Sequence, residues 1–163
     1  MKKQSELLNE WYRRVAVTQY AHYLSASHFG SRAYWLGVPT ILLSTLVGTS
    51  VFATIEKQPD LWIRVAVGLA SVLAALLASL QTFMGYAERA EKHRMAGARY
   101  GALGRELEQM KSSEKELADE VIAALRKRID DLALEAPNNP LKIYRQAGGV
   151  DIEVIKKSEQ PLH

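Results

Sequence analysis

Two long stretches without a charged side chain constrain the fold of this chain more than any other feature. They cover residues 33–55 and 65–86 and are almost wholly apolar. A helix rises about 1.5 Å per residue, so about 20 residues cross a hydrocarbon core of roughly 30 Å. Both stretches reach that length. The sequence therefore predicts an all-α integral membrane protein whose two spans form a transmembrane hairpin.

The segments that flank the two spans predict their orientation. The short connection between the spans carries only Lys57 and Arg64 as basic residues, and its length requires the two helices to be antiparallel. Basic residues are more numerous before the first span and after the second: Lys2, Lys3, Arg13, Arg14, Arg32, Arg89, Lys92, Arg94, Arg99 and Arg105. Because basic flanks favour the cytoplasmic side, we expect a multi-pass protein of the inner membrane with both termini cytoplasmic.

The main alternative is a buried hairpin in a soluble helical bundle. Helices in a soluble core usually keep polar residues along at least one edge, whereas two adjacent charge-free stretches of this length are typical of membrane spans. A cleaved signal peptide is also disfavoured, because the first apolar stretch begins only at residue 33.

Small and weakly polar residues recur at spacings of three and four along both spans. On the first span they are Gly37, Thr40, Ser44 and Gly48, and on the second Gly68, Ser71, Ala75, Ala78, Thr82 and Gly85. Small residues allow membrane helices to approach closely. Two interpretations follow: the stripes pack the hairpin together, or one of them packs against neighbouring subunits or lines a pore. Gln81, the one large polar residue deep in either span, then bonds a neighbour's backbone or faces a lumen.

The connection between the spans holds two candidate mouth charges, Glu56 and Asp60. A ring of such carboxylates, one set from each subunit, would favour cations; the alternative is that they are solvated turn residues. Two helices alone cannot enclose a water path. A pore therefore requires a homo-oligomer.

The charged segments outside the spans predict further helices. Residues 1–32 read as an amphipathic helix, residues 87–147 as a cytoplasmic helical region and residues 148–163 as a flexible tail. Because no proline lies between Ala87 and Lys111, we expect the second span to continue into this region without a break. A capping box at Ser113 and Glu116 would separate the next helix, which stops before Pro137. The first of these helices carries a packing seam formed by His93, Ala96, Tyr100, Leu103 and Leu107.

Motifs for catalysis are missing from the sequence. The chain has no cysteine, which excludes disulfides, thiolate metal sites and a cysteine nucleophile. His22 and His28 are six residues apart and do not share a helical face, so they do not predict a metal site, and His93 predicts a structural or pH-sensitive contact. We find no phosphate-binding glycine loop and no nucleophile elbow. We therefore expect no enzyme activity, no cofactor and no nucleic-acid partner.

Two stretches of the chain resemble the SLATT domain family, the SMODS and SLOG-associating two-transmembrane effectors of bacterial conflict systems. The first is AHYLSASHFGSRAYWLGVPTILLSTLVGTSVFA, residues 21–53, and the second is AERAEKHRMAGARYGALGRELEQ, residues 87–109. The resemblance rests on Leu36-Gly37 with Pro39, on Gly48-Thr49-Ser50, and on Ala90, His93, Ala96, Tyr100, Leu103 and Leu107. It covers roughly residues 10–147.

The resemblance implies a membrane effector of anti-phage defence that forms a pore or disrupts the membrane when a partner signals infection, leading to abortive infection. The implied partner is a nucleotidyltransferase, a reverse transcriptase or a nucleotide-sensing protein. Two other classes stay open: a non-conducting scaffold that anchors or regulates a partner enzyme, and a nucleotide-binding membrane module. The latter would use Arg94, Arg99 and Arg105, although basic residues after the second span favour anionic lipid headgroups over a nucleotide.

Overall fold

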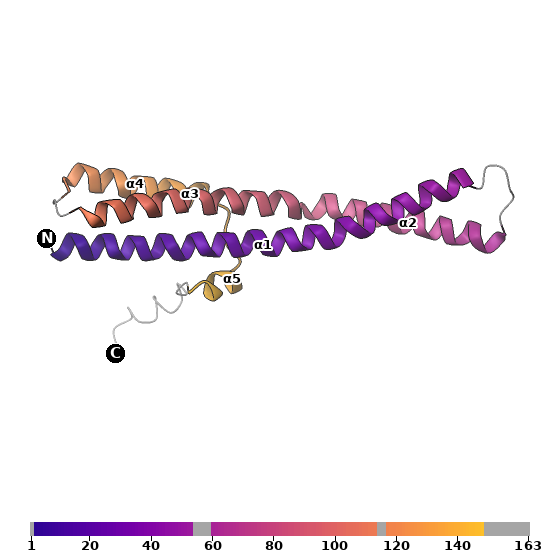
Figure 1. Ribbon diagram of the computed structural model, residues 1–163, viewed down its shortest axis with the longest axis horizontal. Helices are drawn as coiled ribbons and strands as arrows, with labels where there is room; N and C mark the ends of the chain where they lie inside the picture. The colour runs from indigo at the N-terminus through magenta and orange to yellow at the C-terminus, as the bar shows by residue number, and fades with distance from the viewer. Residues whose placement is uncertain (1, 54–59, 114–116, 149–163) are drawn as a thin grey trace, which may run out of the picture. The chain divides into compact units, whose positions relative to one another are not determined.

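The computed structural model describes residues 2–53, 60–113 and 117–148. Every regular element in these ranges is a helix: α1 (Lys2–Ala53), α2 (Leu61–Met84), α3 (Tyr86–Ser112), α4 (Asp119–Glu135) and α5 (Leu141–Gln146) (Figure 1). The predicted all-α class is confirmed. The described chain divides into two units, which we call the hairpin unit, residues 28–89, and the helical unit, made by the residues on either side of it. The predicted flexible tail beyond Gly148 lies outside the described residues.

The hairpin unit pairs the second half of α1 with α2. The two helices run antiparallel, because Phe29 stacks on Tyr86 with ring centroids 6.2 Å apart while Gly37, further along α1, lies beside Gln81. Pro39 lies within α1, and the helix continues past it, as proline permits in membrane helices whose neighbours compensate for the lost hydrogen bond.

The expected continuous helix from the second span into the following region is wrong. Gly85 takes the left-handed conformation, with φ 57°, and its N–H donates to the carbonyl of Gln81 over 3.2 Å. This arrangement ends α2 at Met84, and α3 begins at Tyr86. A left-handed residue after a helix is usually glycine, because a Cβ there clashes with the backbone. The prediction was wrong because it rested on the absence of proline from residues 87–111, whereas the break lies just before them, at Gly85.

The helical unit contains α1 up to Ser27, α3 from Ala90, and helices α4 and α5. Helix α3 is antiparallel to α1, since the Tyr12 hydroxyl donates to Glu108 over 2.6 Å while His22 reaches His93. Helix α4 runs parallel to α1. The Gln4 carboxamide exchanges two hydrogen bonds with the backbone of Leu117, just before α4, and further along the Ser25 hydroxyl donates to Asn139, just after it.

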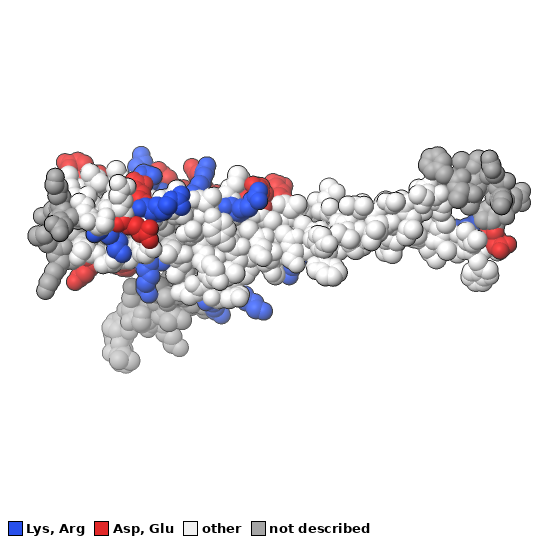
Figure 2. All heavy atoms as spheres, in the orientation of Figure 1, with Lys and Arg blue, Asp and Glu red and all other residues white. Residues whose placement is uncertain are grey.

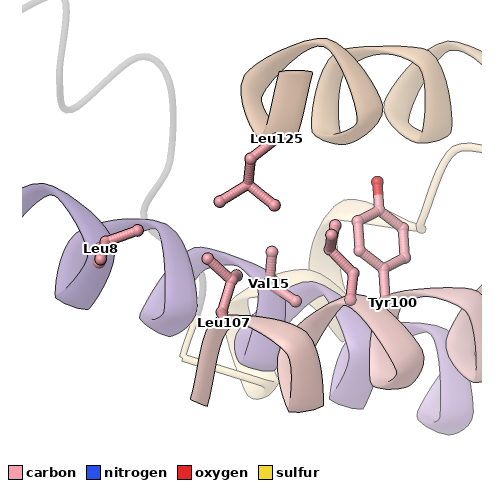
Figure 3. Packing of buried hydrophobic residues seen from close by; sticks show 6 residues of the cluster. Leu8, Val15, Tyr100, Leu107 and Leu125 are labelled. Carbon is pink, nitrogen blue, oxygen red and sulfur yellow. The ribbon is translucent and has the colours of Figure 1, made fainter. Parts of the chain in front are cut away.

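The core of the helical unit lies where α1, α3 and α4 meet. Figure 3 shows Leu8 and Val15 of α1, Tyr100 and Leu107 of α3, and Leu125 of α4, which form this cluster together with Leu103. Glycines on α3 allow α1 to lie close: a Cβ at Gly101 would come within 2.8 Å of the Gln19 carboxamide. The core therefore depends on small residues of α3 as well as on its leucines.

The capping box expected at Ser113 and Glu116 does not begin the next helix. Helix α3 ends at Ser112, and α4 begins at Asp119 after Ala118, whose side chain cannot accept a capping hydrogen bond. Glu116 itself lies outside the described residues. Helix α4 starts instead with Asp119 and Glu120, whose carboxylates favour the positive end of a helix dipole. It ends at Glu135, before Pro137.

Candidate functional site

The hairpin unit exposes a large apolar surface. Trp35, Trp62 and Phe83 are 72%, 82% and 84% exposed, and many aliphatic side chains of both helices are exposed as well. Only 6% of the most apolar stretch of each long helix is buried. A core helix of a soluble protein would be mostly buried, so this exposure counts against the soluble bundle. An apolar surface of this extent requires lipid or other chains around it.

Charge is confined to the ends of this unit. In Figure 2 the charged side chains gather over the helices of the helical unit, and the described surface along α2 and the adjoining part of α1 is white over most of its length. Asp60 and Arg64 lie at the start of α2. Both helices are long and apolar enough to cross a membrane. They form a hairpin with the length and the apolar composition that two membrane spans require.

The hydroxyl side chains of the hairpin bond to their own helices. Thr40 donates to the Leu36 carbonyl and Ser71 to the Val67 carbonyl, each over 2.8 Å, and Thr82 donates to the Ala78 carbonyl over 3.1 Å. A hydroxyl satisfied in this way can face an apolar medium at little cost, because no donor is left without an acceptor. These residues are therefore compatible with lipid as well as with a neighbouring helix.

The small-residue stripes are divided between two faces. Gly37, Thr40 and Ser71 are half-buried, and Ala74 is the most buried residue of α2, at 7% exposure. The other candidates on the two helices are exposed: Ser44, Gly48, Gly68, Ala75, Ala78 and Thr82. A Cβ added at Gly48 or Gly68 would meet no atom within 4 Å. Most of the stripe on α2 thus does not pack the hairpin and is free for another helix.

Gln81 lies about one helical turn before the break at Gly85. Its Nε2 is 3.5 Å from the point where a Cβ of Gly37 would be, so glycine provides the space for this side chain. The residue is exposed, and within the described residues its carboxamide makes no hydrogen bond. An amide in an apolar medium without a partner costs about 1–3 kcal/mol or more. Gln81 therefore favours contact with another polar group or with water.

The candidate mouth charges are only partly described. Glu56 lies outside the described residues. Asp60 immediately precedes α2, is exposed, and makes no side-chain capping hydrogen bond; its backbone carbonyl accepts the N–H groups of Ile63 and Arg64. The Asp60 carboxylate is thus free to face solvent at the start of α2.

The predicted seam on α3 is buried within the helical unit. His93, Ala96, Tyr100, Leu103 and Leu107 are all at most 5% exposed, and the last three join the core cluster with Leu8, Val15 and Leu125. The seam packs on α1 and α4 of the same chain. It is therefore already occupied and leaves no apolar stripe on this face of α3 for a second copy.

A buried histidine pair joins α1 to α3. The Nδ1 atoms of His22 and His93 are 3.0 Å apart, and the His22 ring stacks on Tyr100 at 5.4 Å. The two histidines are 1% and 3% exposed. With one Nδ1 protonated and the other not, the two neutral rings share a hydrogen bond. Beside the pair the Ser25 hydroxyl donates to Asn139 over 2.9 Å, which ties α1 to the segment before α5.

Sequence reasoning missed this pair. It compared His22 with His28, its near neighbour in the chain, although His28 is exposed in the hairpin unit. A signal was present: His22 follows Val15 by seven residues and precedes Ser25 by three, which places all three on one face of the helix. His93 was assigned to the seam of α3. In the structure α1 and α3 pack antiparallel, and His22 on this face of α1 meets His93 on the seam of α3.

A family model described as SMODS and SLOG-associating 2TM effector domain family 4 matches residues 5–148. The chain belongs to this family. The resemblance inferred from the sequence is thereby confirmed, and it assigns the chain to the membrane and to the effectors of conflict systems. Neither the curated proteins nor the solved structures compared with the chain gave a match. No catalytic family is matched, and the absence of enzyme activity in this SLATT protein stays a prediction.

The SLATT histidine pair should make the stability of the helical unit depend on pH. Burial, and secondarily the neighbouring His93, lowers the pKa of His22 from 6.5 to about 4, and burial lowers the pKa of His93. The unfolded chain therefore binds more protons than the folded chain between these values. The free energy of unfolding is largest above about pH 6.5 and falls as the pH decreases toward 4, by up to about 3 kcal/mol for His22.

Urea unfolding of the detergent-solubilised chain between pH 7.5 and 5 measures this slope. His22→Gln should flatten it, whereas His28→Gln, at an exposed position, should leave it unchanged. Equal slopes in all three proteins would show that the pair does not set the pH dependence. Because burial lowers both pKa values below the usual value, the pair stays neutral near pH 7 and acts there as a structural contact; its sensitivity to pH appears only in acid.

The arginines considered for nucleotide binding are largely engaged. Arg94 pairs with Glu91 over 2.7 Å, and Arg99 pairs with Glu135 over 2.5 Å. A hollow of about 330 Å³ lies beside His22 and Tyr100, and the residues that line it include no lysine or arginine. A phosphate group would find no cation there. The arrangement thus counts against this hollow as a site for a nucleotide phosphate.

Proposed function

We propose that the chain is an oligomeric effector that permeabilises the inner membrane when a partner or a nucleotide-derived signal activates it. The proposal is carried by the hairpin unit, where Gln81 and most of the small-residue stripe of α2 are exposed. In lipid these groups gain more from a second hairpin than from acyl chains, because membrane helices associate through close packing and polar contacts.

The proposed oligomer explains why polar groups share the apolar helices. Two helices cannot surround water, but copies arranged in a ring place one helix of each hairpin toward a central path. Gln81 and the hydroxyl of Thr82 would then supply polar groups along that path, and Asp60 with Glu56 would form its mouth. In this arrangement Ala75 and Ala78 provide close contact between neighbouring copies.

Both termini are proposed to be cytoplasmic. The residues that follow α2 include Arg89, Lys92 and Arg94, whereas α2 begins near a single arginine, Arg64. The positive-inside preference favours this orientation. It places the helical unit in the cytoplasm, where a nucleotidyltransferase, reverse transcriptase or nucleotide-sensing partner would reach it. Residues 1–32 and 87–147 then form the part that receives the signal, and residues 33–86 form the part that responds.

Ion flux from potassium-loaded vesicles tests the proposal. We expect the purified chain to release potassium in a manner that rises with protein density or with addition of the products of neighbouring genes. Gln81→Leu should reduce the flux by about tenfold or more, since it removes the one large polar group of the path. Ser79→Ala serves as the matched control, because the Ser79 hydroxyl is already bonded to the Ala75 carbonyl.

Vesicles that stay sealed under every one of these conditions, with the chain correctly inserted, would overturn the pore. That result would favour the alternative of a non-conducting scaffold that anchors or regulates a partner enzyme. Equal loss of flux in both variants would instead remove Gln81 from the path.

A further inference from the structure

A groove of about 1040 Å³ runs between α1 and α4 in the helical unit. Its apolar lining comes from Leu7, Trp11 and Val15 on α1 and from Ile122, Ala123 and Ile129 on α4. Helix α4 is held to α3 on another side, where Arg128 pairs with Glu106 and Arg99 with Glu135, each over 2.5 Å. Apolar side chains between two helices that are anchored elsewhere mark a surface on which a further element can pack.

The ion pairs on the two rims of the groove have their acid and base in opposite order along the chain. On α1 an acid comes first and a base four residues later: Glu10 and Arg14 form an ion pair. On α4, where Asp119, Lys127 and Asp131 also line the groove, the ion pair has its base first and its acid four residues later: Arg126 and Asp130 lie 3.8 Å apart. The four side chains of these two pairs are 48% to 74% exposed. Within the described part of the chain, no ion pair crosses the groove from one rim to the other.

The two rims are in a fixed register. Gln4 is level with Leu117, and Ser25 with Asn139, so each residue of α1 is level with the residue 113 or 114 positions later. Arg126 therefore lies two or three residues beyond the level of Glu10, and Asp130 lies the same number beyond the level of Arg14. At about 1.5 Å per residue, both offsets are about 3–5 Å, a distance that long charged side chains span.

We propose that the groove is a two-fold contact with a second copy of this chain. A two-fold axis along the helices leaves every residue at its own level and places α1 of each copy opposite α4 of the other. In this arrangement Glu10 faces Arg126 of the other copy, and Arg14 faces Asp130 of the other copy, with the same axial offset in both pairs. Because the contact is two-fold, each ion pair occurs twice. A strongly acidic or strongly basic partner would instead meet like charges on either rim.

The proposal rests on the proposed membrane function in one respect: insertion in the membrane sets the direction in which the two copies run. Chains inserted in one membrane with the same orientation run parallel, as this two-fold contact requires. The contact would join copies through the helical unit. The exposed small-residue stripe of the hairpin would then remain available for contacts with further copies.

Cross-linking of two single-cysteine variants tests the contact, because the chain has no cysteine of its own. Leu7→Cys and Ala123→Cys are purified separately, mixed in vesicles of phosphatidylethanolamine and phosphatidylglycerol, and treated with a short bismaleimide, so that links between the two variants arise only between copies. The matched control replaces Ala123→Cys with Ala124→Cys, at an exposed neighbouring position that does not line the groove. We expect several-fold more linked dimer from the first mixture.

Charge reversal tests which residues of the two copies face each other. Arg126→Glu should weaken the dimer by about tenfold or more, because it turns two facing ion pairs into two like-charge contacts. Adding Glu10→Arg should restore most of the linking, which separates a lost contact from a lost fold. Arg94→Glu, in the Arg94–Glu91 pair of α3, is the control and should leave the yield unchanged.

Equal yields from the two cysteine mixtures, or no restoration by the double variant, would overturn the proposal. Potassium flux from the same vesicles separates it from the proposed function. Linking without flux would support the contact and count against the pore, whereas flux without linking would leave the pore standing and remove this contact.

Discussion

Replacing Leu107 with alanine is expected to lower the free energy of unfolding of the helical unit by about 3 kcal/mol. Leu107 is wholly buried where α1, α3 and α4 meet, against Val15 and Leu125 (Figure 3). Truncating such a side chain removes its transfer free energy and leaves a cavity that the three helices fill only in part. The loss is a large fraction of the stability of a typical domain.

Chemical unfolding in detergent, followed by the fluorescence of Trp11 with Trp35→Phe and Trp62→Phe in the background, measures this loss. Leu134→Ala provides the control, because Leu134 is 86% exposed on α4 and its truncation should change the free energy of unfolding by no more than about 0.5 kcal/mol. Similar losses in the two variants would mean that the packing around Leu107 is not the core of this unit.

Replacing Leu76 with arginine is expected to prevent stable insertion of the hairpin. Leu76 lies near the middle of α2 and is 61% exposed. In lipid, an arginine at the centre of a helix costs about 2.5–3.5 kcal/mol, whereas at an exposed position of a soluble helix the same substitution changes stability by about 0.5 kcal/mol or less. The substitution therefore separates a span from a soluble helix.

The readout is the fraction of the chain that stays in the membrane after alkaline extraction. Leu134→Arg, at the exposed position on α4, should leave that fraction unchanged. If Leu76→Arg extracts no more than the control, α2 does not lie in the hydrocarbon core.

The two spans could be predicted because each depends on one local property. A charge-free stretch of about 20 residues specifies a membrane helix by length alone, and the short segment from 56 to 64 specifies an antiparallel pair. The seam on α3 was visible for the same reason, since Tyr100, Leu103 and Leu107 share one face at helical spacing.

Features that depend on two distant segments could not be predicted in this way. The contact between His22 and His93 joins residues 71 positions apart, and neither position shows the partner of the other. The register of α1 against α4 is likewise set by hydrogen bonds such as Ser25 with Asn139. The exposure of Ala75 and Ala78 is a third case, because spacing identifies a stripe but not the helix that it faces.

Gly85 is a different kind of failure. The residue was visible and was counted as a member of the small-residue stripe, where its size was the property considered. In the structure its φ of 57° is what matters, because the left-handed conformation ends α2 and begins a new helix at Tyr86. A glycine in a stripe of small residues can serve packing or backbone geometry, and the spacing pattern does not distinguish the two.

Labelling of single cysteines in intact cells tests the central claim, the membrane hairpin with both termini inside, most directly. Asp60→Cys, Leu76→Cys and Ser112→Cys place a thiol before α2, in the middle of α2 and at the end of α3. With a membrane-impermeant maleimide we expect Asp60→Cys to react in intact cells and Ser112→Cys only after lysis, while Leu76→Cys stays unreactive until detergent is added. Reaction of all three only after lysis, or of Leu76→Cys as readily as Ser112→Cys, would contradict the membrane hairpin.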